Sequence, residues 1–282
     1  MATTSEVLTL ERDGHVATLW LDSPERRNAM GPALWSDLPL MMAEVSDDDD
    51  VRAVVIAARG PAFTVGLDLK TMGSAIAGEG GGAGEGGAGH TSEAGRRRTA
   101  LRGIKRLQAS INAVADCPKP VIAAVHGWCI GGGIDLICAC DVRLASADAT
   151  FSVRETKIAI VADLGTLQRL PGIVTKGHVA ELAYTGKDIS AERAVEIGLV
   201  NQVLPDADAC HKAAHEMAVE IASNSPLAVQ GTKAVLRASE GKSVEEGLDY
   251  VGVWNAAFLT SDDLTEAFTA FLEKRPPEFT GQ

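Results

Sequence analysis

Three acidic residues stand in one largely apolar part of the sequence and have the chemistry of acids and bases. Asp135 follows the glycines 131–133, Glu155 lies in the segment VRETKIAIVADLG, and Asp163 comes eight residues later. A carboxyl group among apolar side chains has a raised pKa, so one such group can hold a proton while another accepts one. The alternative for each residue alone is a solvated surface carboxylate, so the interpretation depends on their occurring together.

A glycine-rich turn precedes these acids and offers a second chemical feature. Val121–Val125 is a run of β-branched residues and alanine after two prolines, which predicts a buried strand, and Ile134–Ala139 predicts a helix. The glycines between them leave backbone N–H groups open to a ligand, at a helix start where partial positive charge gathers. Such donors can stabilise a developing oxyanion, although a simple tight turn would also use glycines.

Three segments of the sequence, CPKPVIAAVHG, CIGGGIDL and ADLGTLQRLP, resemble the crotonase (enoyl-CoA hydratase/isomerase) superfamily. The resemblance extends over nearly the whole chain. Within the superfamily, Asp163 in the third segment resembles the dienoyl-CoA isomerase branch, because hydratases have glycine at that position. It implies an α/β fold, with a crotonase-type ββα spiral core and a C-terminal all-helical oligomerisation region.

The resemblance also implies roles for the three acids. Glu155 would be the base that removes the C2 proton of 3,5-dienoyl-CoA, Asp163 the acid that protonates C6, and Asp135 would polarise or orient this pair. The product would be 2,4-dienoyl-CoA, in fatty-acid β-oxidation. The apolar run 158–161 is expected to keep Asp163 protonated by raising its pKa. No metal and no separate cofactor are implied, since coenzyme A is part of the substrate.

The segment FTVGLDL, residues 63–69, resembles the first oxyanion loop of the family. The implied donors are the backbone N–H groups of Leu67 and Gly132. The residues expected to bind substrate are therefore Val65, Gly66, Leu67, Asp68, Leu69 and Gly132, with Asp68 more readily explained as structural. The side chains of Arg26, Arg27 and Lys70 are candidate contacts for the CoA phosphates, and solvated charges are an equal alternative.

Two other functions compete with the isomerase. A 2-enoyl-CoA hydratase also needs two carboxylates. Hydratases of the family resemble this pattern but have glutamate at both of the positions that correspond to 135 and 155. Here the first is the shorter Asp135, and a third acid stands at position 163. A non-catalytic acyl-CoA-binding homologue is the second alternative, and the intact set of carboxylates argues against it.

Composition restricts the partners. The chain has 282 residues, 46% of them hydrophobic, and a net charge of −12, which argues against nucleic acid and anionic membranes as partners. Its five cysteines include no CxxC pair and indicate reduced thiols. Without a leader-like N-terminus, an apolar run of membrane-spanning length or a C-terminal SKL signal, a soluble cytoplasmic protein is expected.

The elements that would position the site follow from periodicity and turn signals. A hairpin around Asp13-Gly14, a helix from Pro32 to about Val45, a strand at Val51–Ala58 and a helix at Arg96–Ala115 precede the central stretch. Helices at 176–185 and 191–197 and a strand at 200–204 follow it. Helices alone are expected beyond: 206–223, 226–240, 243–260 and 262–273.

This change in composition predicts two regions. Residues 1–203 would form the core with the acyl-CoA site, and residues 204–282 would assemble homotrimers or hexamers. Two further patterns are given no function. The low-complexity segment 78–89 contains GxGxxG but lacks the flanking strand and helix of a dinucleotide site. His211 and His215 have zinc-like spacing without a third ligand, so an exposed helix face is expected.

Overall fold

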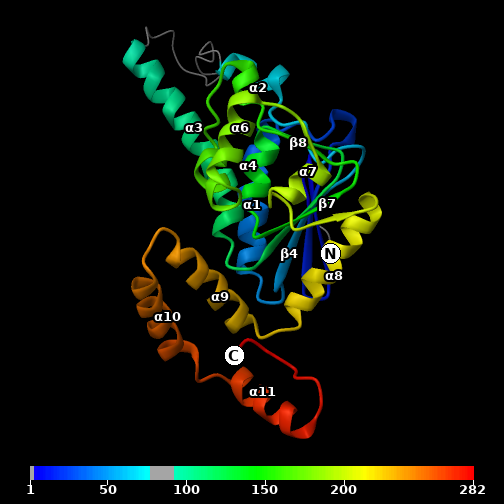
Figure 1. Ribbon diagram of the computed structural model, residues 1–282, viewed down its shortest axis with the longest axis vertical. Coiled ribbons are helices and arrows are strands. Elements are labelled where there is room, and N and C mark those ends of the chain that lie inside the picture. The colour runs from blue at the N-terminus through cyan, green and yellow to red at the C-terminus, as the bar shows by residue number, and fades with distance from the viewer. Residues whose placement is uncertain (1–2, 77–91) are drawn as a thin grey trace.

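The computed structural model describes residues 3–76 and 92–282 (Figure 1), so the predicted glycine-rich loop at 78–89 lies outside the described residues. Within the described residues, seven strands form one sheet in the order β1-β2-β3-β4-β5-β7-β10. The strands are β1 (Thr3–Thr4), β2 (Leu8–Asp13), β3 (Val16–Leu21), β4 (Ala53–Ala58), β5 (Val121–Val125), β7 (Val142–Ser146) and β10 (Gln202–Leu204). Pairing is antiparallel from β1 to β3 and parallel from β3 to β10.

The predicted hairpin and the predicted central strands are confirmed. Asp13 pairs with Val16, so the two-residue turn is Gly14-His15, one position later than expected, and Gly14 supplies the positive φ of 55° that it requires. Every residue of β4 is buried, with alternate side chains entering the cores on the two faces of the sheet. That burial explains why β4 is apolar throughout rather than alternating.

A smaller sheet sets the glycine turn beside Glu155. Its strands are β6 (Trp128–Ile130), β8 (Thr150–Ser152) and β9 (Ile189–Ser190), in the order β6-β8-β9. Ile130 pairs with Ser152 in the parallel β6–β8 ladder. Parallel strands end at the same edge, so the glycines that follow Ile130 and the residues that follow Ser152 leave the sheet together.

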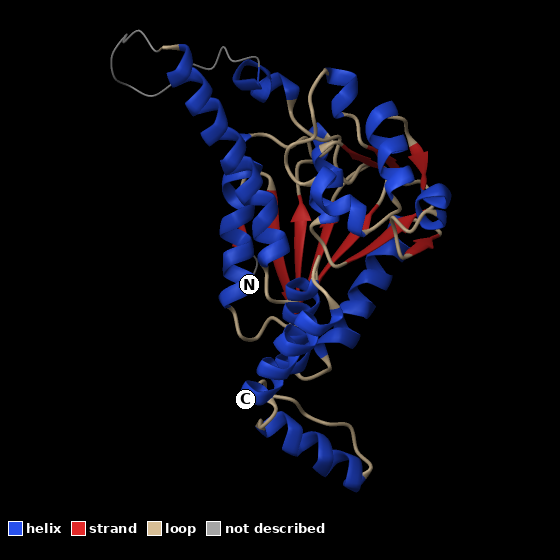
Figure 2. Cartoon of the chain, turned by 60° about the vertical axis from the view of Figure 1, so that its left-hand side comes forward, coloured by secondary structure: helices blue, strands red, loops and turns tan. Residues whose placement is uncertain are grey.

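Helices cover both faces of the large sheet, as Figures 1 and 2 show. On one face, α1 (Pro32–Asp47), α3 (Glu93–Asp116) and α4 (Gly132–Cys138) pack into the main hydrophobic core. The helix α4 begins two residues earlier than predicted, so Gly132 is its first residue. On the other face, α8 (Ala207–Ala222) lies against β4, β5 and β7, with Ala214, Ala218 and Ala222 allowing close approach.

The helix α8 also corrects one expectation. His211 does not lie on an exposed face: its ring packs edge-on against the rings of Trp20 and His126, each with centroids 5.2 Å away. The reason is that α8 lies on the sheet and turns this side chain toward it. His215 lies 3.3 Å from Asp13 instead, and no metal-binding cluster of His, Cys, Asp or Glu occurs among residues 3–76 and 92–282.

The last three helices lie away from the sheet, at the bottom of Figure 1. They are α9 (Pro226–Ser239), α10 (Val244–Phe258) and α11 (Asp262–Glu273), close to their predicted bounds. Each begins at a serine whose side chain accepts an N–H of the first turn, the usual N-cap. The buried Lys233 ties α9 to the core, with its Nζ 2.6 Å from Asp141 Oδ2 and 2.9 Å from the Lys119 carbonyl oxygen.

Short elements complete the chain around the site. They are η1 (Pro24–Arg26), α2 (Leu69–Ile76), η2 (Glu155–Ile158), α5 (Thr166–Arg169), η3 (Leu170–Gly172), α6 (Lys176–Thr185) and α7 (Ala191–Glu196). The helix α8 packs on the sheet, whereas α9–α11 lie beyond it. The division of the chain at 203/204 stays a prediction.

Candidate active site

Two backbone loops meet beside the glycine turn. Thr64 pairs with β6: its N–H donates to the Trp128 carbonyl at 2.8 Å, and its carbonyl accepts from Ile130 at 3.2 Å. Gly66 has a φ of 82°, and a Cβ there would lie 2.6 Å from the Ile130 carbonyl oxygen and 3.6 Å from the Gly132 nitrogen. Only glycine allows this approach, so the structure brings the two predicted oxyanion loops together.

The predicted donors are oriented by the hydrogen bonds of their neighbours. Gly66 accepts from Met30 at 2.8 Å and Asp68 donates to Met30 at 3.1 Å. Backbone direction alternates along an extended segment, so the N–H of Leu67 faces away from Met30. Gly132 is the first residue of α4, where an N–H has no partner within the helix. Neither N–H group therefore takes part in the backbone hydrogen bonds that hold its loop in place.

Glu155 lies over the glycine turn. Its Oε1 is 3.4 Å from the position that a Cβ on Gly131 would occupy. Its Oε2 is buried and has no hydrogen-bond partner within the described part of the chain. Burial, followed by the charges of Asp135 and Asp163, raises the pKa of Glu155 to about 7. A carboxyl group with that pKa and an unpaired oxygen is suited to take up a proton near neutral pH.

Asp135 is enclosed more completely, with 1% of its surface exposed. Its Oδ1 accepts two hydrogen bonds from Thr166, from the backbone N–H at 2.6 Å and from the hydroxyl at 2.7 Å. Burial raises the pKa of Asp135, and the two bonds from Thr166 oppose that rise because they stabilise the charged form.

Asp163 lies in the loop before α5 and is half-buried. Burial raises its pKa, as predicted, but the apolar run 158–161 is not the whole cause: Ile158 is 43% and Val161 73% exposed. The short η2 turn ends at Ala159, which has a positive φ, and both of these side chains face solvent. The buried neighbours of Asp163 in the chain are Ala162 and Leu164.

The remaining predicted residues fall into two groups. Asp68 is buried, forms an ion pair with Arg26 and begins α2 by accepting the Lys70 N–H and the Thr71 hydroxyl, which supports a structural role. Val65 donates its N–H to the Arg27 carbonyl, and Leu69 is the exposed first residue of α2. The binding of CoA phosphates by Arg26, Arg27 and Lys70 stays a prediction, with Arg26 already engaged by Asp68.

Two positioning contacts were not predicted. Thr166 contacts Asp135 across 31 positions of sequence, and Gln108 of α3 donates its side-chain amide to the Asp163 carbonyl oxygen at 2.6 Å across 55 positions. No local sequence signal pointed to either contact, since Thr166 has polar neighbours in Gln168 and Arg169. Neither partner follows from local periodicity, because each contact joins separate elements.

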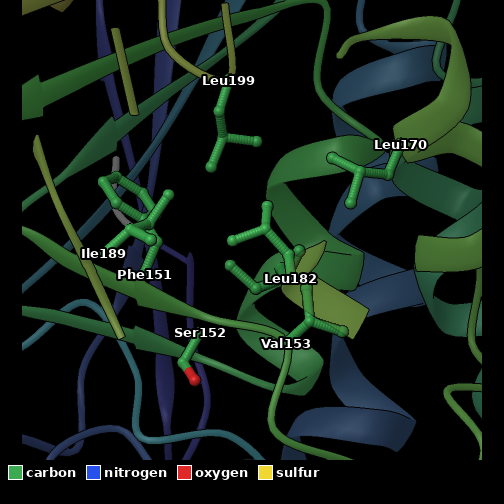
Figure 3. A pocket seen from close by; sticks show the side chains of 8 residues that line it. Phe151, Ser152, Val153, Leu170, Leu182, Ile189 and Leu199 are labelled. Atoms are coloured by element: carbon green, nitrogen blue, oxygen red, sulfur yellow. The ribbon is translucent and has the colours of Figure 1, made fainter. Parts of the chain in front are cut away.

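An apolar cluster packs around the residues of β8 that precede Glu155 in the chain. Figure 3 shows Phe151, Leu182, Ile189 and Leu199 gathered around the end of β8, with Ser152 at the edge. The hydroxyl of Ser152 donates to the Gly186 carbonyl oxygen at 3.0 Å. None of the three acids lines this cluster, so it fixes the strand that leads to Glu155 and is not the reaction site.

The chain is similar to proteins of known name over nearly its full length. It is 43% identical to the mitochondrial Delta(3,5)-Delta(2,4)-dienoyl-CoA isomerase of Dictyostelium discoideum, over 94% of this chain and 87% of that one. It is also 43% identical to the peroxisomal protein of the same name from Arabidopsis thaliana, over 98% and 96%. A putative enoyl-CoA hydratase structure from Streptomyces coelicolor superimposes with a TM-score of 0.87, at 30% identity, over 100% and 98%.

These relatives contradict one expectation. Their names place them in mitochondria or peroxisomes, so the predicted cytoplasmic location is wrong by this comparison. That expectation depended on missing targeting patterns, and a missing pattern carries no information on location. In residues 3–76 and 92–282, no helix combines the length and the apolar character needed to cross a membrane.

The family model for enoyl-CoA hydratase/isomerase matches residues 11–86 and 86–282. The matched ranges contain both predicted oxyanion loops and all three acids. Together with the structural likeness, this match confirms the predicted crotonase-type α/β fold with its C-terminal helices. The chain belongs to the enoyl-CoA hydratase/isomerase family.

Proposed function

We propose that the protein is a Δ3,5-Δ2,4-dienoyl-CoA isomerase. The observation that carries this proposal is the third acid, Asp163, a half-buried carboxyl group close enough to Glu155 and Asp135 to influence the pKa of each. Two relatives with this name, each 43% identical over nearly the whole chain, support it. The reaction would convert a 3,5-dienoyl-CoA into the 2,4-dienoyl-CoA by moving one proton equivalent from C2 to C6.

The first half of the reaction forms an enolate. The thioester oxygen would accept the N–H groups of Leu67 and Gly132, and Glu155 would remove a proton from C2. Negative charge then develops on the oxygen, and preorganised donors stabilise it more than they stabilise the neutral carbonyl. The unpaired Oε2 and the pKa of about 7 support Glu155 as the base.

The second half delivers a proton to the far end of the conjugated system. The negative charge spreads from C2 through C4 to C6, and Asp163 would donate its proton to C6. The double bonds then lie at C2 and C4, Glu155 carries the proton from C2, and Asp163 is ionised. Exchange with solvent restores both groups. Burial of Asp163 acts in the direction that this step needs, because it raises the pKa of that carboxyl group.

A hydratase is the competing function, because the solved structure from Streptomyces coelicolor carries that name. Hydration would need Asp135 and Glu155 to share one water near C2 and C3. The two bonds that Oδ1 of Asp135 accepts from Thr166 turn this short side chain toward α5, which favours an orienting role over direct water activation.

Assembly and the remaining contacts complete the proposal. The substrate is an acyl-CoA thioester, coenzyme A is part of it, and no further cofactor takes part. Trimers or hexamers would form through residues 204–282, where large apolar side chains are exposed on α10 and α11, among them Val253, Phe268, Phe271 and Leu272. Burial of such side chains against another copy is the expected source of association.

One experiment separates the two enzymes. The purified protein is offered a 3,5-dienoyl-CoA and a short 2-enoyl-CoA in parallel. The proposal expects the absorbance of the conjugated 2,4-diene to grow in the first and little loss of enoyl absorbance in the second. Rapid hydration of the 2-enoyl-CoA without diene formation would make the protein a hydratase, and no turnover of either would make it a binding homologue.

A further inference from the structure

Thr166 is a buried residue with no role in the proton transfers described above. Its hydroxyl and its N–H both donate to the same oxygen of Asp135, and both residues are almost completely enclosed, with 0% and 1% exposure. We propose that Thr166 is a positioning residue, which holds Asp135 as an oriented carboxylate and so determines which of the three acids carries the mobile proton. This inference deepens the proposed function and rests on it.

The position of Thr166 is fixed by its neighbours. It begins α5 after Gly165, whose φ is 133°. That φ favours glycine, and a Cβ at Gly165 would also require the guanidinium of Arg169 to move. Arg169 is in turn held by Asn112 of α3, whose Oδ1 accepts from Nη2 at 2.6 Å. Thr166 is β-branched and therefore has few rotamers, so its two donors are in place before substrate arrives.

The groups that face Asp135 divide by charge. Glu155 and Asp163 are acids whose charges oppose its ionisation, and Arg169 favours it. Cys129 and Cys138 are buried thiols that stay neutral, because burial raises the pKa of Cys129 strongly and that of Cys138 to about 12. Burial is the largest influence on the pKa of Asp135 and raises it. The hydrogen bonds from Thr166 are the largest influence that lowers this pKa, and the charge of Arg169 is a smaller one.

The consequence concerns the distribution of protons. The active form proposed for this site has Asp135 and Glu155 ionised and Asp163 protonated. Three acids whose charges shift one another's pKa titrate as a coupled set, so stabilising one charged form moves the proton to another member. Without the hydroxyl, a form with the proton on Asp135 and the charge on Asp163 competes, and that form has no acid for C6.

The test uses two substitutions that differ by one group. Thr166→Val keeps the branched shape and the backbone N–H but removes the hydroxyl, whereas Thr166→Ser keeps the hydroxyl. With ¹³C-carboxyl aspartate in the full-length protein, the signal of Asp135 is assigned by its loss in Asp135→Asn. In Thr166→Val the titration of Asp135 should move to higher pH, and in Thr166→Ser it should stay close to that of the wild type.

Activity supplies the second readout. In Thr166→Val, kcat should fall about tenfold, the effect of one lost hydrogen bond of about 1.4 kcal/mol, with KM nearly unchanged. Thr166→Ser should restore kcat to nearly the wild-type value. A folded Thr166→Val protein with the wild-type Asp135 titration overturns the inference. Because that titration needs no turnover, it decides the matter even if wild-type protein fails to isomerise the dienoyl-CoA and the proposed function falls.

Discussion

The carboxylate of Glu155 lies over the backbone of Gly131, with Oε1 3.4 Å from the position that a Cβ on Gly131 would take. Gly131 also has a positive φ of 52° and caps α4, whose first N–H is the proposed oxyanion donor. Gly131 is thus next to both the proposed base and the proposed donor. A methyl group on residue 131 would contact the Glu155 carboxyl group beside the proposed donor.

We therefore expect Gly131→Ala to lower kcat at least tenfold and to cost more than about 1 kcal/mol of stability, because its φ is positive and its ψ of −114° lies outside the left-handed helical region. Gly14→Ala is the matched control, because Gly14 has a φ of 55° and no other atom lies within 4 Å of the position that a Cβ there would take. Both variants should lose stability in thermal unfolding but remain folded at the assay temperature, and only the first should lose activity. Equal kcat for the two would show that the place above Gly131 is not part of the site.

The anion site itself is tested at Gly132. Gly132→Pro removes the N–H and should lower kcat by about 10²–10³-fold, the usual effect of losing one oxyanion donor. Gly132→Ala keeps the N–H, and its Cβ would meet the end of the flexible Met30 side chain at 2.8 Å. Steady-state kinetics should place Ala well above Pro. If folded Gly132→Pro keeps nearly normal kcat, the assignment of this donor is wrong.

The pH dependence follows from Glu155. A base must be ionised, so kcat/KM should fall about tenfold per pH unit below the Glu155 pKa of about 7. At higher pH it should fall again, because Asp163 must keep the proton that it donates to C6. The negative charge of Asp135 contributes to that raised pKa, so Asp135→Asn should move the limb to lower pH in whatever activity remains. If the low-pH limb of Asp135→Asn stays in place or moves to higher pH, the carboxyl groups of Asp135 and Glu155 do not interact as proposed.

The sequence predicted most elements because their patterns are local. The apolar run of β4, the Pro at the start of α1 and the serine caps of α9–α11 each act within a few residues, and those elements appear close to the expected positions. Motif resemblance gave the three acids and the two loops, which the structure brings together. Contacts between distant segments were missed: Thr166 with Asp135, Gln108 with Asp163, and the burial of His211 depend on packing that periodicity does not describe.

Assembly gives a further prediction. Light scattering at micromolar concentration should find three or six chains. Phe271→Glu should shift the protein toward monomer, because Phe271 is 80% exposed on α11 and a buried glutamate in an interface is costly. Leu40→Glu on α1 is the control, since Leu40 is 69% exposed and lies outside residues 204–282. A wild-type monomer, or dissociation by the α1 variant alone, would contradict the role of the C-terminal helices.

Asp163→Asn should separate the two halves of the reaction. It keeps the shape of the side chain and removes the acid, so isomerisation should fall by about 10²–10⁴-fold, the usual contribution of one acid–base group. Exchange of the C2 proton with solvent, which needs only Glu155 and the anion site, should survive in part. Glu155→Gln should abolish both. Wild-type isomerisation by Asp163→Asn would make Asp163 structural and favour a hydratase.

The central claim is that one carboxyl group removes the proton at C2 and a different one delivers a proton at C6. Conversion of 3,5-dienoyl-CoA in deuterated water, followed by NMR of the product, tests it most directly. Because Asp163 exchanges with solvent before it donates, we predict deuterium at C6 of 2,4-dienoyl-CoA from the first turnovers. Transfer of the original C2 hydrogen to C6 without solvent label would mean that a single group carries it, and would contradict the two-group mechanism.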